Sequence, residues 1–455
     1  MSMKKMFLVF MALAVLAAAL PAAQASAETI TWPGSWSLRT DPAWSVLQSL
    51  FPDELSDNSV TVNGDVPGAV FGGVTVGPGD VTGNSVTVNG GTIGNSVLGG
   101  LAGAGDATGN SVTVNSGKVT GYVWGGVSDN GGATGNSVTI NGGEVAGNVS
   151  GGATYSGGIC DTTYNTVTIS GSPVFGATTI LEGGGYGADD FTGNTLNVEN
   201  YSGSAVFEVY WFEFFNFTFP STQSGPVLTV TDFANLGNFL ASKGSTVTAG
   251  TSGGVPLAVG KSVTLIEAGT LNLNGFTQTQ AGGAGYLWDL EVIPGVDGTL
   301  SATVAKTLWV DLQNATITGG AFTAGKAGSL TFAVSTAGIP DGSPITLNNI
   351  NSVPGISIET KATTTTGINA AVSISEAVTT GNSTIVTIST TAATPAGTHP
   401  LTLTIDGVTS AEFYLTVNEP EPRGSGGCLN TGAGMVGMLA LALLAALRKG
   451  KKTAR

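Results

Sequence analysis

One short phrase recurs along the first half of the chain and constrains its fold more than any other feature. GNSVTVNGG begins at Gly83, GNSVTVNSG at Gly109 and GNSVTINGG at Gly135, and looser copies flank these three. When six copies are aligned on their asparagine, the intervals between them are 26, 26, 26, 29 and 29 residues. A fixed period in this range is the mark of a solenoid or a propeller. The six aligned residues are Asn58, Asn84, Asn110, Asn136, Asn165 and Asn194.

Apolar and polar residues alternate inside each copy. Val86 and Val88 are separated by hydroxyl-bearing residues, and this period of two predicts a strand with one buried face. A second short apolar pattern follows and ends in a glycine pair such as Gly125-Gly126, which permits a sharp corner. Units this short fit one coil of a β-solenoid rather than a four-stranded propeller blade. We therefore predict an all-β chain with a right-handed β-solenoid of about 26-residue coils over residues 58–200.

Stacking of the coils gives each repeated residue a defined role. Coils that follow one another at roughly 4.8 Å place equivalent valines in an inward aliphatic ladder. The repeated asparagines then stack at a corner, where their amides can bond to each other and to corner backbone groups. The alternative is that each asparagine is an ordinary turn residue on the surface. We favour the asparagine ladder.

Both ends of the solenoid need caps, because open strand edges promote aggregation. The segment DPAWSVLQSLF, from Asp41, predicts a short amphipathic helix within an N-terminal cap at 28–57. The run AVFEVYWFEFFNFTF, from Ala205, predicts an aromatic-rich wide coil or cap within 201–305, with a membrane-insertion hairpin as the alternative. The stretches VGKSVTLIEAGTLNLNG and AGYLWDLEVIPGVDGTLSATV in this part resemble the closing coils of autotransporter passenger domains, and the resemblance concerns the passenger fold alone.

The texture of the sequence changes after the solenoid. Ser and Thr become more frequent, the repeat ends, and THPLTLTIDGVTSAEFYLTV resembles the last hairpin of a bacterial Ig-like domain. The segment 306–417 has a suitable length for one β-sandwich. We predict an Ig-like β-sandwich there, acting as a stalk between the solenoid and an anchor.

The first residues have the pattern of an export signal. Residues 1–27 combine two early lysines, an apolar stretch and small residues at Ala25 and Ala27, where a signal peptidase would cleave. We predict a signal peptide with a mature start near Glu28. An uncleaved membrane anchor is the alternative.

The last residues have the pattern of a membrane anchor. The segment 429–447 is apolar and about long enough to span a bilayer, and the basic tail 448–455 would hold its end in the cytoplasm. A linker at 418–428 precedes the predicted transmembrane helix and ends in a Gly-Gly-Cys motif.

This order of Gly-Gly-Cys, apolar helix and basic tail resembles the bacterial C-terminal sorting domains of the Synerg-CTERM type. The resemblance implies cleavage by a rhomboid-like sorting protease, after passage through the secretion machinery, and display at the cell surface or outer membrane. A permanent single-pass anchor is the alternative. The implied processing motif is Gly426, Gly427 and Cys428, with Cys428 as a lipid acceptor.

The acidic charge of the chain limits its partners. Of 15 basic residues, seven lie in the two terminal segments, which leaves eight against 30 acids between Glu28 and Cys428. Such a surface repels phosphate backbones, so we predict no nucleic-acid partner. It favours solubility, or association with cations and cationic partners.

The residues that metal sites and catalytic triads require are scarce. Cys160 and Cys428 form no CxxC motif or Cys/His cluster, which argues against structural zinc. The single histidine, His399, has no matched nucleophile and is interpreted as a turn residue. We therefore predict no catalytic residues, no metal ligands and no cofactor.

Two acid pairs leave narrower alternatives open. Asp80 and Asp106 occupy matching places in successive copies and could hold a weak cation, although capping of a turn is the favoured interpretation. Asp189 and Asp190 share the fifth loop and could serve a glycosidase. A lyase would need a basic residue as proton acceptor, and the repeats contain only Lys118.

Together these features predict a surface-anchored, adhesin-like or cell-envelope structural protein that displays a β-solenoid. Its expected ligand is a host or envelope glycan or protein, bound on the side where unequal loops such as 154–164 emerge. The alternative is a β-helix enzyme acting on polysaccharides, either a lyase or a glycosidase.

Overall fold

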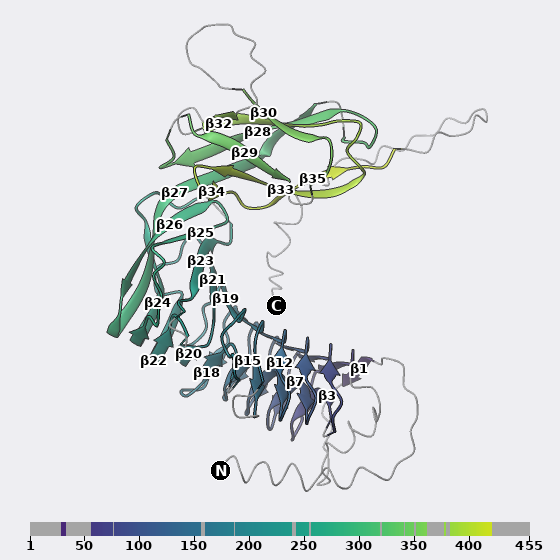
Figure 1. Ribbon diagram of the computed structural model, residues 1–455, viewed down its shortest axis with the longest axis vertical. Helices are drawn as coiled ribbons and strands as arrows, with labels where there is room; N and C mark the ends of the chain where they lie inside the picture. The colour runs from purple at the N-terminus through teal and green to yellow at the C-terminus, as the bar shows by residue number, and fades with distance from the viewer. Residues whose placement is uncertain are drawn as a thin grey trace, which may run out of the picture. The chain divides into compact units, whose positions relative to one another are not determined.

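The computed structural model divides the chain into two compact units, Met1–Ala305 and Lys306–Arg455 (Figure 1). The predicted signal peptide, the capping helix from Asp41, the C-terminal linker beyond residue 420, and the predicted transmembrane helix and tail lie outside the described residues. No helix within the described part of the chain is long and apolar enough to cross a membrane. The structure describes residues 29–32, 56–75, 77–155, 160–185, 187–238, 243–253, 256–318, 321–340, 342–349, 352–361, 377–378 and 383–420.

The repeated SVTV segments form one parallel sheet, in which each coil contributes one strand. Equivalent residues face each other in register, so that Val86 lies beside Val60 on one side and beside Val112 on the other. Residues 29–32, within the predicted N-terminal cap, pair in parallel with the first repeat and add a strand to this sheet. In spatial order the strands are β1 (Thr29–Trp32), β2 (Ser59–Val62), β5 (Ser85–Val88), β9 (Ser111–Val114), β13 (Ser137–Ile140), β16 (Thr166–Ser170), β19 (Thr195–Glu199), β21 (Phe214–Phe219) and β23 (Thr246–Thr251).

A second parallel sheet is built from the glycine-pair segments and their successors. Its strands are stacked coil upon coil like those of the first sheet (Figure 1). They are β3 (Val70–Val74), β7 (Val97–Ala102), β11 (Val123–Ser128), β15 (Val149–Thr154), β18 (Ile180–Glu182), β20 (Val206–Tyr210), β22 (Leu228–Asn235) and β24 (Ser262–Asn272).

Two small parallel sheets close the regular coils, so the predicted β-solenoid with coils of about 26 residues is confirmed. The first contains the short strands that follow each SVTV segment, and the second contains those that precede it. The strands are β6 (Thr92–Ile93), β10 (Lys118–Val119), β14 (Glu144–Val145) and β17 (Val174–Phe175) in the first, and β4 (Val81–Thr82), β8 (Ala107–Thr108) and β12 (Ala133–Thr134) in the second.

The core of the solenoid changes from aliphatic to aromatic along its axis. Val86 and Val112 are 1 % exposed, and they represent the valine rungs of the early coils. In β21 the equivalent positions are Phe215 and Phe217, which are also buried. Trp288 is fully buried near the end of the unit and donates its indole N–H to the Ala249 carbonyl at 2.7 Å. The aromatic run thus supplies core rungs of the later, wider coils.

Antiparallel pairing ends the stack. The first part of β27 (Gly295–Thr318) runs antiparallel to β24, and β25 (Gln280–Gly283) pairs antiparallel with β26 (Tyr286–Ile293). Coils stack on one another through parallel strands, so the change to antiparallel pairing ends that pattern.

The second unit contains two antiparallel sheets. The later part of β27 pairs with β28, β28 with β32, and β32 with β30, all antiparallel. Phe332 packs edge-to-face against Phe413 of the other sheet at 5.7 Å between ring centroids. The segment predicted as a final hairpin forms β33, which pairs antiparallel with β34 and β35. The remaining strands are β28 (Gly328–Ala337), β29 (Pro344–Asn349), β30 (Ile356–Lys361), β31 (Ala377–Val378), β32 (Ser383–Thr390), β33 (Gly397–Ile405), β34 (Val408–Thr409) and β35 (Phe413–Val417).

Candidate binding surface

The repeated asparagines are buried and bonded from coil to coil. Asn84 donates both its backbone N–H and its side-chain Nδ2–H to Oδ1 of Asn110, at 3.0 and 2.9 Å. Asn110 repeats this arrangement with Asn136, and its Nδ2 also donates to the Val81 carbonyl at 2.9 Å. At the end of the row, Nδ2 of Asn194 donates to the carbonyls of Thr162 and Asp190. The asparagine ladder therefore satisfies polar groups inside the wall, and it offers no surface to a ligand.

The glycine pairs exist because the asparagine ladder fills the space inside them. A Cβ on Gly126 would lie 2.4 Å from Oδ1 of Asn136, and one on Gly125 would lie 2.5 Å from the Gly151 carbonyl oxygen. No side chain fits at either position. The larger side chains of β11 therefore come before and after the glycine pair in the sequence. They pack in two different apolar clusters. Val123 joins the main core, whereas Trp124 and Val127 belong to a separate apolar cluster.

This separate cluster carries an exposed group of aromatic rings. Tyr122 and Trp124 are stacked almost parallel, with ring centroids 4.9 Å apart and an interplanar angle of 2°. Tyr155, from the next coil, meets Trp124 edge-on at 6.4 Å. Tyr122 and Tyr155 are 36 % and 41 % exposed, whereas Val127 of the cluster beneath Trp124 is fully buried. We call this surface the aromatic face, defined as Tyr122, Trp124, Val127, Ala153 and Tyr155.

In the strand register, buried polar residues follow Trp124 in the next two coils. Trp124 lies beside Ser150, Ser150 beside Glu182, and Glu182 beside Tyr210 in successive coils. Glu182 is only 7 % exposed, and it accepts a hydrogen bond from Nδ2 of Asn148 at 3.3 Å. Burial raises the pKa of Glu182 to about 8, against the opposing effect of that hydrogen bond, so the carboxyl is mostly neutral at pH 7.

A second acid lies close to Glu182. Glu208 is paired with Ile180 across the strands, and its negative charge further raises the pKa of Glu182. Burial, and then the charge of Asp232, raise the pKa of Glu208 itself. Two neighbouring carboxyls with different environments are a recurrent feature of acid–base sites.

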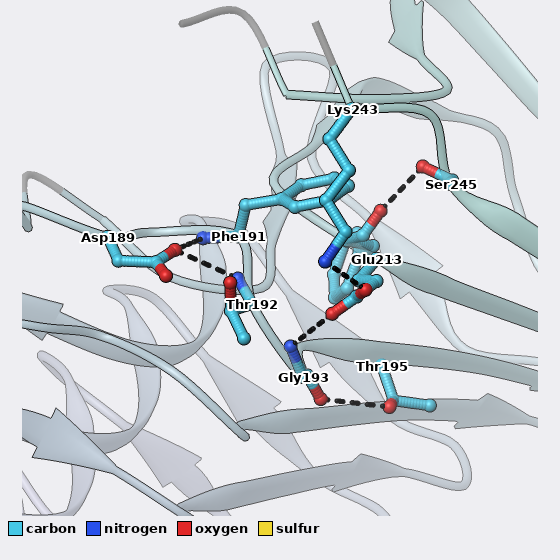
Figure 2. Close-up of polar contacts among 9 residues, drawn as sticks. Asp189, Phe191, Thr192, Gly193, Thr195, Glu213, Lys243 and Ser245 are labelled. Atoms are coloured by element: carbon cyan, nitrogen blue, oxygen red, sulfur yellow. Dashed lines mark hydrogen bonds and ion pairs between the residues drawn. The ribbon is translucent and has the colours of Figure 1, made fainter. Parts of the chain in front are cut away.

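The acids of the fifth loop have mainly structural partners (Figure 2). Asp189 accepts hydrogen bonds from the backbone N–H groups of Phe191 and Thr192 at 3.0 and 2.9 Å. Partial burial opposes ionisation, but these bonds outweigh it and lower the pKa of Asp189. Burial raises the pKa of Asp190 to about 6, and the charge of Asp189 adds to this effect. The loop conformation therefore depends on an ionised Asp189.

The fifth loop is also joined to the following coils by an ion pair. Glu213 accepts a hydrogen bond from the Gly193 N–H at 2.7 Å and pairs with Lys243 at 2.5 Å, and Figure 2 shows the carboxylate between them. The Lys243 ammonium also lies 5.8 Å from the centroid of the Phe191 ring. Such a contact adds a modest cation–π attraction.

The other residues singled out in the sequence have local roles. Asp80 accepts a hydrogen bond from the Asp106 N–H, and Asp106 accepts one from the Gly132 N–H, both at 2.8 Å, so each carboxylate caps a turn of the next coil. His399 lies within β33, where it pairs with Leu415, and it is buried with Nε2 3.0 Å from the Pro395 carbonyl oxygen, so its interpretation as a turn residue is wrong.

One further residue singled out in the sequence, Cys160, is also placed. The free thiol of Cys160 contacts the Asn130 carbonyl oxygen at 3.2 Å. The described residues contain no group of His, Cys, Asp and Glu that could hold a metal ion. The predicted processing residues lie outside the described ranges: Ala25, Ala27, Gly426, Gly427 and Cys428.

Sequence reasoning missed the aromatic face and Glu182. The available signal was a change at fixed repeat positions: Trp124 occupies the place of Leu98 in the preceding coil, and Glu182 occupies that of Ser150. Comparison of the chain with protein-family models, curated proteins and solved structures found no match in any of the three.

Proposed function

We propose that this protein is an adhesin-like binding protein of the bacterial cell surface, in which the β-solenoid is a rigid scaffold. The observation that carries the proposal is the aromatic face. Tyr122 and Tyr155 remain substantially exposed, and they are fixed by contact with Trp124. Tyrosine and tryptophan held rigidly at a surface are the residue types that dominate binding energy in interfaces.

The proposal includes the route to the surface that the two ends of the sequence suggest. Residues 1–27 direct export, and 429–447 hold the chain in the inner membrane with the basic tail in the cytoplasm. A rhomboid-like protease then cuts near the Gly-Gly-Cys motif and releases the chain to the cell surface. Mass spectrometry of the mature protein tests this route, because a peptide ending at Arg455 would contradict processing.

A binding experiment on intact cells tests the adhesin role. The labelled full-length protein should bind saturably to target cells or isolated envelopes, with competition by unlabelled protein. The double variant Tyr122→Ala/Tyr155→Ala should bind less, whereas Tyr414→Ala, which removes a tyrosine 54 % exposed in the second unit, should bind normally. Unsaturable binding, or equal binding by the double variant, would contradict the role assigned to the aromatic face.

A second candidate function is hydrolysis of a polysaccharide, and Glu182 favours it. Because Glu182 is mostly neutral, it can serve as a general acid, and Glu208 supplies a second carboxyl close to it. Release of new reducing ends from a panel of polysaccharides would support catalysis, provided that Glu182→Gln abolishes the release and Glu267→Gln does not. Binding without such release would leave the adhesin role in place.

A further inference from the structure

We propose that the aromatic face binds a neutral glycan chain, with sugar rings packed against Tyr122, Trp124 and Tyr155. This inference rests on the binding role proposed above and specifies the class of ligand. The proposed binding site extends along the solenoid axis, from the aromatic face at β11 and β15 to the polar positions of β18 and β20.

The first argument is the rigidity of the rings. The near-parallel stack of Tyr122 on Trp124 and the edge contact of Tyr155 hold three aromatic side chains in one arrangement, and Trp124 itself packs on the buried cluster that contains Val127. A sugar ring has C–H groups on its faces and hydroxyl groups around its rim. Its faces can therefore pack on aromatic rings that lose little conformational entropy, because tyrosine and tryptophan have only two side-chain torsions.

The second argument is the polar group that follows the rings. In the strand register, Ser150 and Glu182 lie one and two coils beyond Trp124 along the axis. Neighbouring coils are about 4.8 Å apart. Because burial raises the pKa of Glu182 to about 8, its carboxyl can both donate and accept a hydrogen bond at neutral pH. Sugar hydroxyls also do both, so a hydroxyl-rich ligand matches a neutral carboxyl better than a fixed charge does.

The third argument is charge. Lys118 is the only basic residue between Asn58 and Gly237, and its ammonium is paired with Glu144 at 2.7 Å. Acidic polysaccharides would find no available cation in this part of the solenoid. Glu182 is mostly protonated near neutral pH, so a strongly cationic peptide would find acidic partners only at the flanking Asp129 and Glu208. Asp129 follows β11 at the position next to Tyr155. An uncharged ligand therefore fits best.

Affinity electrophoresis of the full-length protein tests the inference. Gels contain a neutral polysaccharide (galactomannan, xyloglucan or amylose), an acidic one (polygalacturonate or heparin), or no polymer. At least one neutral polysaccharide should retard the protein, and the acidic polymers should not. Tyr122→Ala and Tyr155→Ala should each weaken the interaction about fivefold or more, because truncated aromatic anchors account for much of the affinity at such sites.

Two further variants keep the result interpretable. Trp124→Phe retains an apolar ring over Val127 and should fold normally while weakening binding. Tyr414→Ala is the matched control for loss of an exposed tyrosine and should bind as the unaltered protein does. The unaltered protein should lose affinity above about pH 8, and Glu182→Gln, whose amide cannot ionise, should remove that pH dependence.

Several outcomes would overturn the inference. They are retardation by none of the neutral polymers, retardation by acidic polymers alone, and equal retardation of the tyrosine variants and the control. Salt-sensitive binding of polylysine in place of neutral glycans would identify a cationic peptide ligand instead. The failure of the glycan class is distinct from failure of the adhesin role: saturable, variant-sensitive binding to cells that persists after enzymatic removal of glycans would keep the role and reject the ligand.

Discussion

Asn110 places its backbone N–H and its side-chain amide on the same oxygen, Oδ1 of Asn136, at 2.9 and 3.1 Å. The two residues are 26 positions apart, and both are buried. The bonds between them join successive coils through a side chain as well as through the backbone. Removal of one asparagine therefore leaves several polar groups without partners.

Asn110→Ala should destabilise the solenoid strongly. The change removes the acceptor of two bonds from Asn84 and the donor to the Val81 carbonyl, and each buried group left unpaired costs about 1–3 kcal/mol. Urea unfolding followed by circular dichroism measures the loss. Asn115→Ala is the matched control, because Asn115 forms a similar row of side-chain bonds that is exposed. Equal loss in both variants would contradict the importance of burial.

Gly126→Ala should also be destabilising, for a steric reason. The new Cβ would lie 2.4 Å from Oδ1 of Asn136, so either the strand or the asparagine must move. Clashes of this kind in a packed interior typically cost about 1–3 kcal/mol. The control is Gly90→Ala, where the nearest atom is 3.6 Å away. Its thermal midpoint should stay close to that of the unaltered protein, and a fall as large as that of Gly126→Ala would refute the steric explanation.

Glu182 should make the protein less stable as the pH rises towards 8. Its pKa is raised from 4.5 to about 8 in the folded protein, so between these values the folded state holds a proton that the unfolded state has lost. Stability conferred by protonation is complete below about pH 4.5 and falls by roughly 1.4 kcal/mol per pH unit across the window. Urea midpoints at pH 6.5 and 8 test this above the range of Asp190, whose pKa is about 6.

Replacement of the carboxyl isolates the contribution of Glu182. Glu182→Gln should flatten the decline between pH 6.5 and 8, whereas Glu267→Gln, which changes an exposed carboxyl, should not. An unchanged slope in the Glu182 variant would show that its protonation is not linked to folding over this range.

Glu213→Ala should loosen the fifth loop more than Lys243→Ala does. The glutamate holds the Gly193 N–H as well as the ammonium, whereas Lys243 is half-exposed and contributes an ion pair worth about 1 kcal/mol or less. Hydrogen exchange at Gly193 should therefore accelerate clearly in Glu213→Ala and only slightly in Lys243→Ala. The reverse order would indicate that the cation, rather than the backbone contact, fixes the loop.

The solenoid could be predicted from the sequence because its strands repeat with a fixed period and alternate strictly. Val86 and Val88 indicate a half-buried strand, and the 26-residue interval indicates what that strand pairs with. Both signals are local or periodic, and so they are visible without coordinates. The all-β character and the solenoid coils followed from them directly.

The candidate site could not be predicted in the same way. Trp124 and Glu182 lie in different coils, and the insertions of the later coils obscure that one column of the sheet contains both. The neutral state of Glu182 depends on burial by surrounding atoms, which the sequence does not report. The pairing of residues 29–32 with β2 was missed for a related reason, since TITW alternates correctly but lacks the flanking repeat phrase.

The bonds between one ladder asparagine and the next all run in one direction, from each coil to the one that follows it in the sequence. An additional copy of a 26-residue coil, inserted between two existing copies, would find a donor on one side and an acceptor on the other. Every rung would remain complete. The length of this molecule can thus change in whole coils by duplication or deletion within a gene, while a partial coil would leave a buried amide unpaired.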